Sequence, residues 1–116
     1  MGEYHDHAQR YHATAGELRK HIPGTYDGYR LMHKEAMSEG ELSAGVKELI
    51  AMAYGIAERC DSCIAAHARG AARHGVTEKQ AAESISVAIM MQGGPGTVYG
   101  AKAFEAFKEF AERYAK

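Results

Sequence analysis

The chain has 116 residues, a length that suits one domain built around a single hydrophobic core. Its formal charge is −1 and its sequence pI is about 6.6, so the composition offers no basic surface for nucleic acid or an anionic membrane. We therefore expect one domain over residues 1–116, with no nucleic-acid partner and no membrane partner.

The first seven residues are polar and acidic, whereas a secretory signal begins with basic and then apolar residues. The longest apolar stretch, residues 87–91, is far shorter than the roughly 20 residues that cross a bilayer. We expect a cytoplasmic protein, in which a close thiol pair is more often catalytic or metal-binding than a structural bridge. His5, His7 and His12 are expected to lie in a solvated chain end, and metal binding there is the less favoured alternative.

The spacing of apolar residues predicts helices throughout, because no segment alternates with the period of two that a half-buried strand needs. The first two helices are expected over 6–20 and 25–38, and Ser43 is the expected N-cap of a third. The third helix repeats apolar residues at steps of three and four, which predicts a buried face made of Val46, Leu49, Ile50, Ala53, Ile56 and Ala57.

The fourth helix carries the second cysteine and is expected to end at Gly75. Thr77 and Gln80 form a possible capping box for the fifth helix, which the glycine-rich stretch 93–96 terminates. A last helix over 97–114 should bury an apolar face that contains Phe104, Phe107 and Phe110.

Small residues in 51–55 and 65–72 let two helices approach closely, so the third and fourth helices are expected to form an antiparallel hairpin with the cysteines at its turn. The predicted fold class is an all-α bundle of about six helices in which the cysteine pair begins a helix. Several apolar helix faces in so small a domain also suggest burial in an oligomer.

The two cysteines of the chain lie in the motif Cys60-Asp61-Ser62-Cys63, and His67 follows four residues later. A helical spacing places Cys60, Cys63 and His67 on one face. A helix N-terminus favours a thiolate at Cys63, and His67 can accept its proton. Such a thiolate can attack a peroxide and become a sulfenic acid, with which Cys60 can condense to a disulfide. Asp61 opposes ionisation of the thiols unless its carboxylate points to solvent.

Other interpretations of the motif remain. The cysteines can be small core residues, with His67 a satisfied interior histidine. Cys60, Cys63 and His67 can instead be three zinc ligands, although a structural site needs a fourth, and no second pair of ligands is visible in the sequence. A thioredoxin-like fold is rejected, because that fold needs strands before the motif and residues 46–59 are strongly helical.

The residues of this motif and its surroundings resemble those of a known protein family. Glu48, the CxxC motif, His67, Gly75 and Glu83 are similar to the alkylhydroperoxidase D (AhpD)-like branch of the carboxymuconolactone decarboxylase family. The family pattern places a glutamate twelve residues before the first cysteine and a histidine four residues after the second. The segments 42–50 and 93–95 also resemble the helix entry and the glycine-rich break of these proteins.

The resemblance implies an all-helical subunit, commonly a trimer or hexamer, with peroxidase or disulfide-reductase activity. It implies that Cys63 attacks peroxide or a partner's disulfide, that Cys60 is the resolving thiol, and that Glu48 and His67 form a proton relay. No cofactor is expected beyond the redox-active Cys60–Cys63 disulfide, and no metal. Electrons in the best-known members come from a lipoylated protein and pass to a peroxiredoxin. The decarboxylase branch lacks the cysteine pair, so lactone decarboxylation is a poor interpretation.

The chain departs from that pattern at one position. The best-known members carry a further histidine immediately before the second cysteine, where this chain has Ser62, which shortens the relay. Geometry also separates Glu48 from the cysteines, since twelve residues of straight helix span about 18 Å. In a hairpin that turns near Asp61, Glu48 is level with about Arg73, so a water, a bend or a neighbouring subunit is expected to link it to His67.

The leading hypothesis is thus a cytosolic thiol-dependent peroxidase or disulfide reductase. The alternatives are a redox-silent helical oligomer that binds zinc or a small ligand, and a diverged family member that acts on an unknown small molecule.

Overall fold

The computed structural model describes residues 2–115, so Met1 and Lys116 of the single domain expected above lie outside the described residues. This part of the chain contains seven helices and no strand. In chain order, they are α1 (Glu3–Gln9), α2 (His12–His21), α3 (Pro23–Met37), α4 (Ala44–Ala57), α5 (Asp61–Arg73), α6 (Glu78–Gln92) and α7 (Gly94–Tyr114). The all-α class is therefore confirmed, with one helix more than the six expected.

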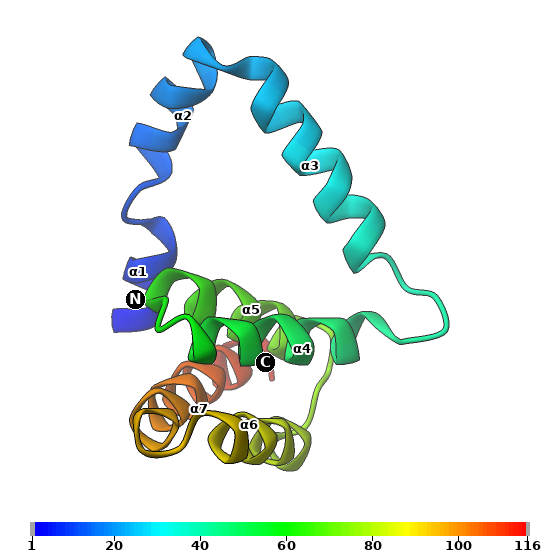
Figure 1. Cartoon of the computed structure of the whole chain (residues 1–116), viewed down its shortest axis with the longest axis vertical. Coiled ribbons are helices and arrows are strands. Elements are labelled where there is room, and N and C mark those ends of the chain that lie inside the picture. Colours follow the sequence, from blue (N-terminus) through cyan, green and yellow to red (C-terminus); the bar gives the residue numbers. More distant parts are fainter. Residues whose placement is uncertain (1, 116) are drawn as a thin grey trace.

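The helices α4, α5, α6 and α7 pack into a bundle, and α4 and α5 form the expected antiparallel hairpin (Figure 1). The centre of α5 is lined by Ile64, Ala65, Ala68 and Ala71, all fully buried. Because alanine adds little bulk, α5 can lie close to both α4 and α7, its main neighbours. Phe107 and Phe110 of α7 fill the remaining core as predicted, whereas Phe104, the third phenylalanine of the predicted face, is only partly buried against it.

Local sequence signals position most helix ends. The Ser43 side chain accepts a hydrogen bond from the Val46 N–H at 3.1 Å and starts α4. Thr77 and Gln80 form a complete capping box at the start of α6. Gly75, with a φ of 78°, follows the end of α5 and takes the left-handed conformation that glycine tolerates best.

The expected helix over 6–20 is wrong. The chain breaks at Arg10 and Tyr11, which separates α1 from α2. The helix α1 is held against the bundle, because Tyr4 is buried and the His5 N–H donates a hydrogen bond to Glu109 at 3.0 Å. The solvated chain end expected there is therefore also wrong, since the described residues of α1 pack on α5 and α7.

The helices α2 and α3 leave the bundle and form an arm that arches away from it (Figure 1). Neither helix buries a single residue within this chain. Its exposed apolar side chains are Leu18, Ile22, Tyr29, Leu31 and Met32. The arm returns to the bundle at the beginning of α4 and has no core of its own (Figure 1).

A second apolar surface lies on α4 and α6. Val46 and Ile50 are 42% and 45% exposed, so their expected burial is wrong, although Ile56 is buried as predicted. These two residues lie at the edge of the apolar stripe of α4, and together with Tyr54 they face away from the bundle. Of the helices in residues 2–115, none combines the length and the apolar character that a membrane-spanning segment requires.

Candidate active site

The turn between α4 and α5 holds Cys60 by its backbone. The Arg59 N–H donates to the carbonyl of Ile56 at 3.1 Å, and the Cys60 N–H donates to the carbonyl of Gly55 at 3.0 Å. This pair of bonds is a Schellman motif, which ends α4 and places Arg59 in the left-handed conformation with a φ of 54°. The chain therefore reverses within three residues, and Cys60 has a defined position before α5 begins.

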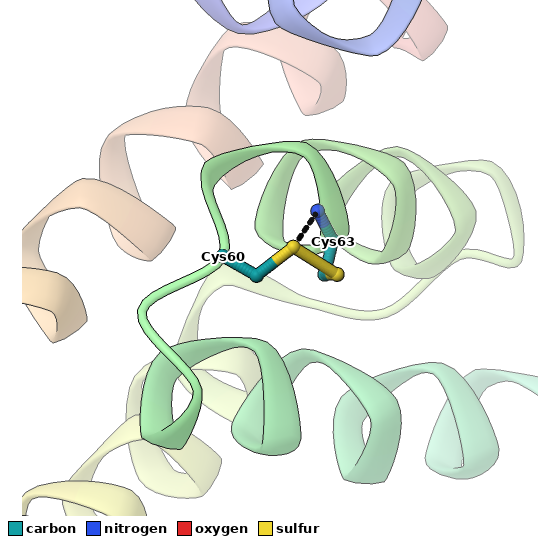
Figure 2. The surroundings of a disulfide bond; sticks show 2 residues. All are labelled: Cys60 and Cys63. Carbon is teal, nitrogen blue, oxygen red and sulfur yellow. Dashed lines mark hydrogen bonds between the residues drawn. A yellow bond between two sulfur atoms is a disulfide. The ribbon is translucent and has the colours of Figure 1, made fainter.

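The same cysteine starts the next helix. Cys60 is the N-cap of α5, and its Sγ accepts a hydrogen bond from the Cys63 N–H at 3.1 Å (Figure 2). The sequence placed Cys60 on a continuous helical stripe with Cys63 and His67, and this detail is wrong because α4 ends before Cys60. The N-cap position nevertheless gives the Cys60 sulfur a backbone donor and the positive end of the helix dipole.

Cys60 and Cys63 form a disulfide, with their Cα atoms 5.2 Å apart. Cys63 is exposed at the first turn of α5, whereas Cys60 is half-buried. Gly55 of α4 lies directly behind them, because a Cβ added there would meet the Ile64 nitrogen at 3.1 Å and the Cys63 Cβ at 3.3 Å. Close packing of the two helices therefore holds the cysteine pair at the surface.

Glu48 and His67 form a direct pair within the chain. Oε1 of Glu48 lies 2.8 Å from Nδ1 of His67, and Glu48 is only 8% exposed. The expectation that a water, a bend or another subunit must link them is wrong. Because the hairpin turns at Arg59 rather than near Asp61, Glu48 lies opposite Gly70, and the side chains of Glu48 and His67 close the remaining distance.

Gly70 makes room for this carboxylate. A Cβ added at Gly70 would overlap the carboxyl group of Glu48, so any larger residue would push that group away. Glycine inside a helix costs roughly 1 kcal/mol relative to alanine, which makes a glycine in this alanine-rich helix a signal in itself. No motif in the sequence marks Gly70, although this cost could have identified it.

The pair fixes the chemistry of the imidazole. The Glu48 carboxylate accepts a hydrogen bond from Nδ1–H of His67, so the lone pair of the neutral ring lies on Nε2. His67 lies one helical turn after Cys63 on α5. A buried carboxylate that orients a histidine in this way is the arrangement that supports general base and general acid steps.

Two further residues modify the charge around the site. The carboxylate of Asp61 lies 3.6 Å from the ammonium of Lys102 on α7, so its negative charge beside the cysteines is partly compensated. His33 of α3 lies nearly parallel to His67, with ring centroids 6.5 Å apart. No spacing in the sequence links His33 to His67, since the arm brings them together.

Within residues 2–115, no group of three or more His, Cys, Asp or Glu side chains is arranged to hold a metal ion.

An all-helical bundle with a disulfide at a helix N-terminus, beside a buried Glu–His pair, defines a class of small helical proteins with a redox-capable cysteine pair. Residues 23–106 match the carboxymuconolactone decarboxylase family, and this chain belongs to that family.

The chain is also similar to two proteins of other bacteria and to a solved structure of the same family. An uncharacterized protein of Cupriavidus necator is 39% identical over 92 residues, which cover 79% of this chain and 81% of that protein. An uncharacterized protein from the cox locus of Paracoccus denitrificans is 32% identical, over 84% of this chain and 87% of that protein. The crystal structure of the apo form of a carboxymuconolactone decarboxylase family protein from Legionella pneumophila superposes with a TM-score of 0.90 at 31% identity. That match covers 94% of this chain and 97% of the other.

Proposed function

We propose that this protein is a thiol–disulfide oxidoreductase of the AhpD-like type, which reduces hydroperoxides or the disulfide of a partner protein. One observation carries the proposal: the Cys60–Cys63 disulfide lies one helical turn from a buried Glu48–His67 pair in the same chain. Neither a structural disulfide nor a core histidine requires that combination, whereas thiol redox chemistry uses both parts of it.

In the first step, the Cys63 thiolate attacks the O–O bond of a hydroperoxide. The sulfur becomes a sulfenic acid, and the leaving alkoxide takes a proton from the imidazolium of His67 to leave as an alcohol. Cys63 suits this role because it is the exposed sulfur and because it lies on the helix face of His67. Glu48 keeps the imidazole oriented through the contact at 2.8 Å.

In the second step, the Cys60 thiolate attacks the sulfenic sulfur of Cys63, which forms the disulfide and releases hydroxide that is protonated to water. The N–H of Cys63 and the dipole of α5 favour the thiolate form of Cys60, which is the form that resolves the intermediate. A dithiol reductant then returns two electrons and two protons to restore both thiols. Attack by that reductant on the exposed Cys63 sulfur expels Cys60 as a stabilised thiolate.

Reduction of a partner protein's disulfide follows the same two steps, with a sulfur atom of the partner in place of the peroxide oxygen. The Cys63 thiolate forms a mixed disulfide with the partner, and Cys60 displaces the partner's thiol. Ser62 cannot act as a base near neutral pH, so the relay in this chain consists of Glu48 and His67. A lipoylated protein as the electron donor and a peroxiredoxin as the acceptor are the partners that this chemistry suits.

We place this activity in the cytoplasm, where a reducing environment keeps a working thiol pair reduced. We also propose that the subunit assembles into a homo-oligomer, a trimer or a hexamer. The support is the apolar surface that the chain leaves exposed on the arm and on α4 and α6. The redox pair itself is the protein's own cofactor.

The cysteine variants test the proposal. We expect Cys63→Ser to abolish peroxide consumption, and Cys60→Ser to accumulate a sulfenic acid on Cys63 that a dimedone label captures for mass spectrometry. Ser62→Ala is the matched control, since it changes the same motif and should retain turnover. Wild-type turnover by both cysteine variants with a competent dithiol would refute the proposal. Near-stoichiometric zinc in protein purified under reducing conditions would instead favour the redox-silent zinc-binding alternative.

A further inference from the structure

A cleft lies where the arm, α1 and the α4–α5 hairpin meet. It has a volume of about 340 Å³ and is lined by Gln9, His33, Glu48, His67, Arg69 and Arg73. The floor of the cleft is open because the two remaining lining residues, Ala66 and Gly70, are small. The Glu48–His67 pair therefore lies in the wall of a cavity that a small molecule can enter.

The charge of this cleft is positive. Arg69 and Arg73 lie four residues apart on one face of α5. Glu48 is the acidic residue in the lining, and its carboxylate is already engaged with His67 at 2.8 Å. Two arginines thus line the cavity together with one carboxylate that is already paired, and an anion gains from entering it.

One of these arginines is held in place. The Arg69 Nε donates a hydrogen bond to the Tyr114 hydroxyl at 3.2 Å, and this bond lowers the pKa of Tyr114 below its usual value. The bond uses Nε, and the edge formed by the two terminal nitrogens can still make paired hydrogen bonds to a carboxylate. His33 and Gln9 add donors from the arm and from α1 on the opposite side of the cleft.

We propose that this cleft binds a carboxylate of the substrate, so that the protein acts preferentially on hydroperoxides or disulfides that carry one. The proposal rests on the function proposed above and names the substrate class of that site. Along α5, Arg69 lies six positions after Cys63, an axial distance of about 9 Å. At about 100° per residue, Arg69 also lies about 120° around the helix axis from Cys63, so a substrate that joins the two has to follow the surface of α5. A substrate with a few carbons between its carboxylate and its reacting bond fits this spacing.

Turnover of a matched pair of disulfides tests the preference. The reduced protein would be mixed with dithiodibutyrate, which carries two carboxylates, or with its neutral diamide. In both reactions the protein dithiol gives two electrons and two protons to the disulfide and yields the protein disulfide and two thiols. We expect kcat/KM to be roughly 10- to 100-fold higher for dithiodibutyrate, as for one or two charged hydrogen bonds.

The Arg69→Gln/Arg73→Gln double variant should bring the ratio of the two kcat/KM values close to one. Lys79→Gln removes one positive charge from α6, outside the cleft, and should leave the ratio unchanged. An equal ratio in the wild type, or an equal loss with Lys79→Gln, would overturn the proposal.

A binding measurement separates the cleft from the chemistry. The Cys60→Ser/Cys63→Ser variant, which cannot react, would be titrated with sodium butyrate or butyramide at constant ionic strength and followed by NMR. We expect saturable shifts of the Ala66 and Gly70 amides and of the His33 and His67 rings with butyrate alone, and their loss in the arginine variant. Absence of butyrate binding together with equal turnover of both disulfides refutes the cleft and leaves the proposed function standing. Butyrate binding without any turnover supports the cleft and refutes the proposed function.

Discussion

The chemistry of the site depends on how a few atoms of Glu48, His67 and Gly70 fit together. The carboxylate of Glu48 is buried, contacts Gly70 and lies 2.8 Å from His67. A hydrogen bond of this length to a charged group is worth roughly 1.5–3 kcal/mol, enough to fix the imidazole in one orientation. Glu48 and His67 are nineteen positions apart in the sequence. They can meet because Gly70 of α5 leaves room for the carboxylate of Glu48.

Gly70→Ala therefore tests the relay without touching its members. We expect the added methyl group to displace Glu48 and to lower peroxide turnover about 10²-fold, the scale of a lost general base. Adding Gly70→Ala to Glu48→Gln should cost little more than Glu48→Gln alone, because both changes remove the same interaction. Gly28→Ala, in open space on α3, is the control and should leave turnover intact. Additive losses in the double variant would show that Gly70 acts elsewhere.

Tyr4 provides a test of how α1 docks. Burial, followed by the nearby carboxylates of Glu105, Glu3, Asp61 and Glu109, raises the pKa of Tyr4 from 10.0 to about 12. The unfolded chain releases this proton near pH 10, whereas the folded chain keeps it until about pH 12. The associated stability is thus fully present below pH 10 and is lost as the pH rises toward 12, at about 1.4 kcal/mol per pH unit.

Tyr4→Phe removes this titration. The free energy of unfolding of the wild type, measured by urea denaturation relative to the variant, should be constant below pH 10 and decline above it. Curves that stay parallel through pH 10–12 would mean that Tyr4 is not buried in the folded protein.

At the scale of the elements, the C-terminal ends of α4 and α5 use the same motif with different residues. Both α4 and α5 end in a Schellman motif, with Arg59 at a φ of 54° in the first and Gly75 at a φ of 78° in the second. A residue with a Cβ pays about 1–2 kcal/mol in the left-handed conformation, and glycine does not. The α4 end is therefore the strained one.

Substitutions at Arg59 and Gly75 should change the free energy of unfolding in opposite directions. We expect Arg59→Gly to raise the free energy of unfolding by roughly 0.5–1 kcal/mol, and Gly75→Ala to lower it by about 1 kcal/mol. The space around Gly75 is open, so the loss of stability in Gly75→Ala comes from the backbone conformation alone. Chemical denaturation of both oxidised variants measures the two shifts, and shifts of the same sign would contradict the assignment of strain to Arg59.

The sequence predicts best those helices whose ends are defined by residues close to them in the chain. Ser43, the Thr77–Gln80 box and Gly93, the cap between α6 and α7, each define an end through contacts within four residues. The break at Arg10 and Tyr11 has no such signal, since it follows from the docking of α1 on the bundle. The Glu48–His67 contact and the approach of His33 depend on hairpin register and on the arm, so spacing alone could not reveal them.

For the whole molecule, the exposed apolar surface has to be explained. The arm buries nothing within the chain, and Ile50, Tyr54, Val87 and Met91 expose apolar area on α4 and α6. The last three line a groove of about 350 Å³ between these helices, together with alanines. Contiguous apolar surface of this kind is costly in water, and a second copy of the chain is the partner that we propose.

Light scattering coupled to size exclusion tests this assembly. We expect the wild type to be a trimer or hexamer, and Met91→Glu to shift it toward smaller species while circular dichroism keeps the helical signal. Lys79→Glu, also on α6 but outside the groove, is the control for a change of charge. A wild-type protein that stays monomeric at micromolar concentration would contradict the proposal.

Cys60 belongs to two helices at once, because its N–H completes the end of α4 and its sulfur caps α5. The number of residues in this connection is therefore as strictly required as the two cysteines themselves. Inserting or deleting one residue between Gly55 and Cys60 would break the bonds that end α4 and so change where α5 begins relative to α4. We expect such a change to separate His67 from Glu48, so that a chain with every site residue present would still lose the site.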